Sequence, residues 1–138
     1  QAKELKRTIE DLDYDIIISS PLIRAKHTSM IINAKNKNIL IDNSTLKYVN
    51  FSGTSMNKIK ITNSNMSESY FTETKFKNIE LDNNNFNKAE FLQTKLYNID
   101  FSNNDISEIV FDNYSIYGAV IDPSQSQFIV GSLGVRFK

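Results

Sequence analysis

Large apolar residues recur at every fifth position through more than half of the chain. The unbroken run comprises Leu46, Phe51, Met56, Ile61, Met66, Phe71, Phe76, Leu81, Phe86, Phe91, Leu96, Phe101, Ile106, Phe111, Ile116 and Ile121. An α-helix repeats every 3.6 residues and a strand every two, so neither produces this spacing over such a length. The pattern therefore predicts a repeat architecture whose unit is five residues long.

A second repeating position lies two residues before each large apolar residue. Small or β-branched side chains predominate there, as in Ser44, Thr54, Ser64 and Thr74. The remaining three positions of each unit are mostly polar. We therefore expect two of every five side chains to point inward and three to face solvent.

A longer period of 20 residues is superimposed on the period of five. Bulky isoleucines occupy the small position at Ile59, Ile79 and Ile99. Asparagines recur at Asn43, Asn63, Asn83 and Asn103, and again at Asn78 and Asn98. Asparagine tolerates turn conformations, and stacked amides bond to each other. Residues 43–122 are thus expected to form about four coils of 20 residues, with asparagines at the corners.

The five-residue pattern resembles the pentapeptide-repeat family, whose unit is A(D/N)Lxx. The resemblance implies a mainly β fold, a right-handed quadrilateral β-helix whose interior is filled by the two inward positions. It also implies a non-catalytic protein. Some members of the family bind DNA gyrase by resembling duplex DNA.

Residues 123–138 are expected to close the last coil. Asp122 is a suitable N-cap and Pro123 a suitable first helical residue, and Gly134 suits a helix end. A helix over 123–133 places Phe128, Ile129 and Leu133 close to one face. The segment resembles the C-terminal part of quinolone-resistance pentapeptide proteins, which implies a cap that also pairs two subunits. A cap without dimerisation remains the alternative.

Residues 1–42 follow a different pattern. They predict helices over 2–12 and 22–34 and strands over 14–20 and 39–41, which together form a short α/β segment acting as an N-terminal cap. The stretch from Asp15 to Ala25, which includes SSPLIRA, resembles the histidine phosphatase (phosphoglycerate mutase-like) family. This resemblance implies that Arg24 is a relict phosphate-binding residue. The two catalytic histidines of that family have no counterpart here, and His27 stands at neither position.

Composition narrows the choice of function. Sixteen basic and 16 acidic residues give no net charge, which argues against direct nucleic-acid binding. The chain has no cysteine, one histidine and no apolar run long enough to span a membrane. We therefore expect a cytoplasmic protein with no catalytic residues, metal or cofactor.

The repeat region also offers a candidate interaction surface. Glu80, Asp82 and Asp100 fall on one face by the 20-residue rule, and Tyr97 and Tyr117 are expected to stack there. Exposed tyrosines are frequent anchors of protein interfaces. The expected partner is a protein, and a type II topoisomerase is one candidate.

The sequence therefore favours a non-catalytic, bacterial-type binding or scaffold protein, with a gyrase-interacting protein as a special case. Two alternatives stay open. One is a purely structural or truncated fusion product, and the other is a remnant phosphoryl-transfer enzyme.

Overall fold

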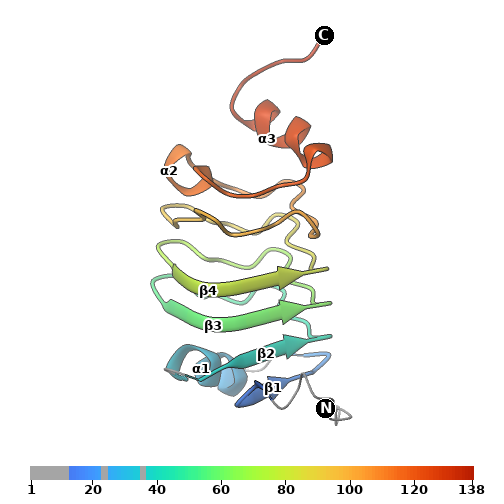
Figure 1. Ribbon diagram of the computed structural model, residues 1–138. Coiled ribbons are helices and arrows are strands. Elements are labelled where there is room, and N and C mark those ends of the chain that lie inside the picture. The colour runs from blue at the N-terminus through green and yellow to red at the C-terminus, as the bar shows by residue number, and fades with distance from the viewer. Residues whose placement is uncertain (1–12, 23–24, 35–36) are drawn as a thin grey trace.

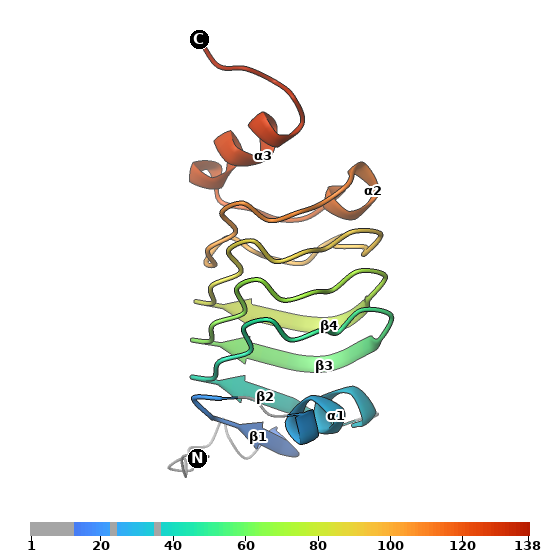
Figure 2. The same cartoon turned by 180° about the vertical axis from the view of Figure 1, so that it is seen from behind.

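The chain climbs through a stack of flat turns, from the N-terminal end at the bottom of Figure 1 to the C-terminal end at the top. This computed structural model describes residues 13–22, 25–34 and 37–138. The view from behind in Figure 2 shows the same layered arrangement, with strands on one side and irregular connections on the other.

Each turn of the stack takes 20 residues, as the sequence predicted. Strands β3 (Ser55–Thr62) and β4 (Lys75–Asp82) are parallel, with Ile59 opposite Ile79. The same spacing continues above them in isolated bridges from Asn85 to Asp105 and from Glu90 to Val110. Each turn contains four pentapeptides, and we number the sides they form one to four; β3 and β4 supply sides three and four.

The N-terminal segment joins the same sheet. It contains β1 (Ile16–Ile18), α1 (Ala25–Asn33) and β2 (Ile39–Asp42). The strand order is β1-β2-β3-β4, all parallel. Strand β1 is shorter than the predicted strand over 14–20. The predicted helix over 2–12 and Arg24 lie outside the described residues.

Aromatic rings fill the centre of the stack. The ring of Phe71 lies between those of Phe51 and Phe91, at centroid distances of 5.3 and 5.1 Å, and is nearly parallel to both. Most large apolar residues of the five-residue run are buried. Phe76 and Leu81 of β4 are exceptions, because each is only partly buried.

A column of small polar side chains runs beside this core, and we call it the buried polar ladder. It comprises Ser20, Ser44, Ser64, Asn84 and Asn104. Each backbone N–H donates to the side-chain oxygen of the next member at 3.0–3.1 Å. At the top, Gln125 Nε2 donates to the carbonyl oxygen of Asn104 at 2.7 Å. The ladder therefore ties both terminal segments to the repeats.

Asparagines occupy corners, but not uniformly. Asn43, Asn63 and Asn83 adopt φ between 49° and 56°, the left-handed region that asparagine tolerates. Asn83 Nδ2 donates to Asn63 Oδ1 at 2.7 Å, as expected for stacked amides. Asn103 departs from the pattern, since it is not among the residues with positive φ and its Nδ2 donates to Asp82 Oδ1.

Helix α2 (Asn113–Ile116) interrupts the top turn on side three. The small position of this side holds Thr54, Thr74 and Thr94 in the lower turns, but Tyr114 here. Tyrosine is too large for that inward site, so the chain coils into a helical turn and Ser115 is buried instead. Asp112 and Ser115 form a capping box that stabilises this turn.

The C-terminal segment closes the stack largely as predicted. A short 3-10 turn, η2 (Pro123–Gln125), is capped by Asp122 and leads into α3 (Ser126–Ser132). Ile129 is buried and Phe128 packs against the core, whereas Leu133 is 51% exposed. Gly134 follows the helix with φ of 89°. In the described part of the chain, no helix is long and apolar enough to cross a membrane.

Candidate ligand-binding groove on the repeat surface

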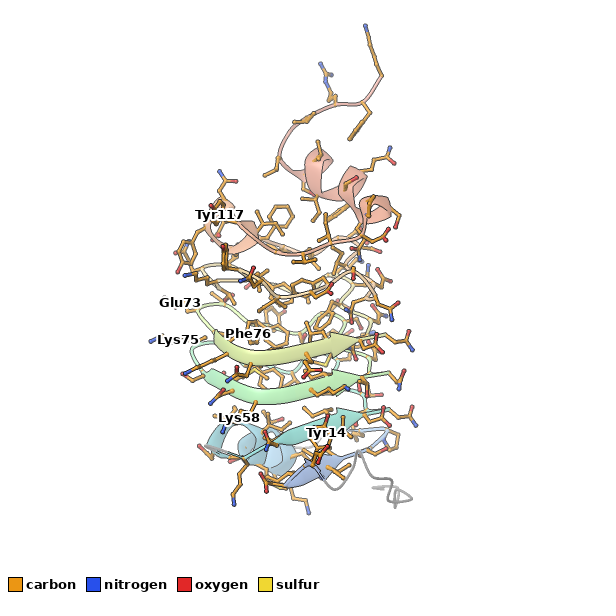
Figure 3. All side chains as sticks on the ribbon, viewed as in Figure 1. Tyr14, Lys58, Glu73, Lys75, Phe76 and Tyr117 are labelled. Carbon is orange, nitrogen blue, oxygen red and sulfur yellow. The ribbon has the colours of Figure 1, made fainter. Side chains whose placement is uncertain are left out.

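Because side chains fill the interior, the outer sides of the stack are where a ligand can bind. On side three lies a groove of about 630 Å³, which we call the lysine–tyrosine groove. Its lining residues are Glu73, Thr74, Lys75, Phe76, Gln93, Lys95, Tyr97 and Tyr114. Figure 3 shows Glu73 and Lys75 projecting from the β4 end of this side, with Phe76 beside them and Tyr117 above.

The groove opens where cross-layer backbone pairing lapses. The backbone N–H of Glu73 donates to the carbonyl oxygen of Leu92 at 2.9 Å, and the next such bond to the layer above starts at Asn83. Strand β4 between them is extended, whereas the residues above it turn tightly. The N–H of Ile99 donates to the carbonyl oxygen of Leu96 at 3.0 Å, and Asn98 has φ of 63°. A strand and a turn cannot share a regular ladder, so β4 is the edge of its sheet.

A pair of tyrosines forms the upper wall. The rings of Tyr97 and Tyr117 stack with centroids 6.0 Å apart, which confirms the predicted stacking. Tyr97 lies directly on the backbone of Gly118, where an added Cβ would come within 2.1 Å of the ring. Both rings remain accessible, at 50% and 73% exposure. The structure therefore holds an aromatic surface in place rather than leaving it mobile.

Basic side chains concentrate on this side. Lys58, Lys75, Lys77 and Lys95 are exposed on it, and they are four of the seven basic residues in the repeat region. Lys95 Nζ lies 5.8 Å from the centroid of the Tyr97 ring, within cation–π range. The ion pairs formed by the described residues, Lys47–Glu68 and Lys60–Glu80, include none of these four lysines. Side three is therefore locally positive although residues 43–122 carry a net charge of −3.

The predicted acidic residues lie on side four, around the corner from the groove. Lys60 Nζ approaches Glu80 at 3.9 Å, and Asp82 accepts a hydrogen bond from Asn103. Hydrogen bonds from the side chain and backbone of Ser102 hold the pKa of Asp100 below its ordinary value. Each acid thus has a local partner. The acids and the two tyrosines therefore do not form one site.

Two further concave surfaces lie elsewhere on the stack. One, of about 710 Å³, follows the asparagine corner and is lined largely by amides that bond to one another. The other, of about 440 Å³, lies at the C-terminal end between Val110, Phe111 and Leu133. Among the residues that the structure describes, no cluster of histidine, aspartate and glutamate could hold a metal ion.

Sequence reasoning found the tyrosines of the groove and missed its lysines. The signal was present, because Lys75 and Lys95 are 20 residues apart, as Tyr97 and Tyr117 are. What the sequence did not reveal was the change from strand to turn between the two layers, and this change opens the groove over Phe76.

Comparison with known proteins identifies the repeats. Residues 64–103 match the family model of pentapeptide repeats in eight copies. No curated protein matches the chain. Among solved structures, it is similar to the pentapeptide-repeat protein Rfr23 from the cyanobacterium Cyanothece 51142, at 16% identity and a TM-score of 0.31. This alignment covers 62% of each chain, so the protein spans less than two thirds of that relative.

A second solved structure is QnrB1, a plasmid-mediated fluoroquinolone resistance protein. It is 13% identical, with a TM-score of 0.25, and the alignment covers 72% of this chain and 90% of QnrB1. The histidine phosphatase resemblance of the N-terminal segment stays a prediction. The resemblance of the central segment is confirmed: residues 64–103 are a run of pentapeptide repeats.

Proposed function

We propose that this protein is a non-catalytic module that binds another protein through the outer sides of its repeat stack. One observation carries the proposal: an ordered aromatic surface, Tyr97 stacked on Tyr117 and seated on Gly118, remains accessible to solvent. Rigid exposed aromatic side chains lose little conformational entropy on binding and commonly anchor interfaces.

Retention of a partner by the immobilised protein would test this. The full chain and its Tyr97→Ala/Tyr117→Ala variant are incubated with a bacterial lysate, and retained proteins are quantified. A protein retained in saturable, stoichiometric amount by the parent and at least tenfold less by the variant supports the proposal. Tyr48→Ala/Tyr70→Ala is a matched control, since both tyrosines are exposed on other parts of the stack. Equal retention by all three proteins would contradict the proposal.

Binding to a type II topoisomerase is a narrower version of the same proposal. It is supported by the acidic residues of side four, Glu80, Asp82 and Asp100, because an acidic surface is needed to resemble DNA. The test is a supercoiling assay with DNA gyrase, with and without a quinolone. Inhibition or protection at micromolar protein, lost in Glu80→Lys/Asp100→Lys, supports this version. No effect up to about 50 μM rules it out and leaves the broader proposal standing.

A further inference from the structure

The upper edge of β4 is an unpaired strand edge inside a groove. Below, β4 pairs with β3 along its length, from Ser55 opposite Lys75 to Thr62 opposite Asp82. Above, the backbone bonds that join other layers are missing between Glu73 and Asn83. An exposed edge of this kind offers backbone donors and acceptors to another extended chain.

The side chains around this edge define the character of a ligand. Phe76 lies half-buried in the groove, with its ring 5.6 Å from that of Phe71 in the core. It offers an apolar contact for one side chain of an incoming strand. Lys75 and Lys95 flank it on successive layers, and Glu73 is the one acidic lining residue of the groove. The charge balance of the lining thus favours an anionic ligand.

We propose that the lysine–tyrosine groove receives an extended, acidic peptide segment of a partner protein, which adds as a strand to the free edge of β4. Its acidic side chains pair with Lys75 and Lys95, and an apolar or aromatic side chain packs between Phe76 and Tyr97. The inference rests on the proposed protein-binding function and names the chemistry of its partner.

A peptide is favoured over a nucleic acid for a structural reason. Stacked aromatics and lysines also suit single-stranded nucleic acids. A nucleic acid, however, leaves the backbone groups along β4 unused, whereas an extended peptide pairs with them at the spacing of a sheet. The acidic side four would also repel a phosphate backbone that extends beyond the groove.

The test is a fluorescence anisotropy titration of the full chain with a labelled nine-residue peptide. The peptide alternates glutamate and valine and carries phenylalanine at its centre. We expect saturable binding with a Kd below about 100 μM. The Lys75→Glu/Lys95→Glu variant should bind at least tenfold more weakly. The control Lys47→Glu/Lys88→Glu makes the same change of charge on side one and should bind as the parent does.

Two further ligands separate edge pairing from simple charge attraction. A peptide N-methylated at alternate residues keeps its charges but loses the backbone donors needed for a strand, and should bind at least tenfold more weakly. Equal binding of the methylated peptide overturns strand addition. Tighter binding of a labelled oligothymidylate than of the peptide assigns the groove to nucleic acid and overturns the proposal, as does the absence of any peptide binding below 1 mM, a threshold of about 4 kcal/mol.

The outcome is distinguishable from failure of the general function. If the lysate partner is retained by Lys75→Glu/Lys95→Glu as by the parent, the module binds protein but this groove is the wrong surface. If the peptide binds as proposed and no lysate protein is retained, the groove stands and the general proposal fails.

Discussion

At the scale of single residues, the departures from the repeat are informative. Tyr114 at an inward position converts one side of the top turn into α2, and Gly118 leaves room for the ring of Tyr97. Asp112 enables the first change, because its carboxylate caps the helix and also accepts two hydrogen bonds from Gln93 in the layer below. Each of these residues can be tested separately.

Asp112→Asn should destabilise the protein in a pH-dependent way. Partial burial opposes ionisation of Asp112, but hydrogen bonds from the backbone N–H groups of Gln93 and Ser115 and from their side chains outweigh it and lower the pKa of this carboxyl. A lowered folded-state pKa adds stability above the unfolded value of about 3.9, and this is lost as the pH falls through the folded value. We expect a loss of about 1 kcal/mol at pH 7 that shrinks toward zero near pH 2.

Urea unfolding of parent and variant at both pH values measures this difference. Glu108→Gln removes the same charge from an exposed side chain and serves as the control. A difference between Asp112→Asn and the parent that does not change with pH would show that the ionised carboxylate has no special role.

Gly118→Ala should dislodge Tyr97. Gly118 has φ of 76°, and its new Cβ would lie 2.1 Å from the Tyr97 ring. Gly53 has φ of 74° and open space around it, with nothing within 4 Å of an added Cβ, so Gly53→Ala carries the backbone strain alone. That strain costs about 1–2 kcal/mol, and the clash adds to it at Gly118.

Thermal unfolding of the two variants isolates the effect of the clash. We expect Gly118→Ala to be the less stable, and the gap to close when Tyr97→Ala is added. Equal stability of Gly118→Ala and Gly53→Ala would mean that Tyr97 moves aside freely and that the aromatic surface is not held in place.

At the scale of elements, the buried polar ladder holds neighbouring turns in register. Asn84 accepts from the N–H of Ser64 at 3.0 Å and donates to the carbonyl oxygen of Ile61 at 2.8 Å. Its position in the next lower turn is filled by Ser64, a smaller side chain with the same accepting role. The register of the layers thus depends on an acceptor here rather than on one particular residue.

Asn84→Ala should therefore cost about 3 kcal/mol, because it leaves the N–H of Ser64 and the carbonyl of Ile61 buried without partners. Asn84→Ser keeps an acceptor and should lose clearly less. Chemical denaturation followed by circular dichroism compares the two. An alanine variant as stable as the serine variant would show that the ladder contributes packing only.

At the scale of the whole molecule, the stack is not uniform. Backbone pairing is continuous on sides one and two, where bridges link Asn65, Asn85 and Asp105 in turn. On side three it lapses above β4, so the molecule has one open seam, visible in Figure 1 above β4. Charge is also uneven, with lysines gathered on side three and acids on side four.

Amide hydrogen exchange should reveal the seam. Amides of β4 that point toward β3 should be strongly protected, whereas those that point away should exchange at least tenfold faster, because they lack a backbone partner. Amides on side two at the same height are the internal reference. Uniform protection across β4 would contradict an open edge and, with it, the proposed peptide groove.

The sequence by itself determined the repeat. A period of five within a period of 20 specifies which side chains point inward, and stacking identical positions is the only way to bury all of them together. It also identified the terminating Asp122 and the Tyr97–Tyr117 stack, because both depend on local spacing. Only the tertiary structure decided where neighbouring layers adopt different backbone conformations. That choice balances Thr94, Asn98 and Tyr114 against the layers above and below, and no single pentapeptide encodes it. The groove over Phe76, the continuation of the ladder through Ser20 and Gln125, and the lapse beside β4 all follow from it.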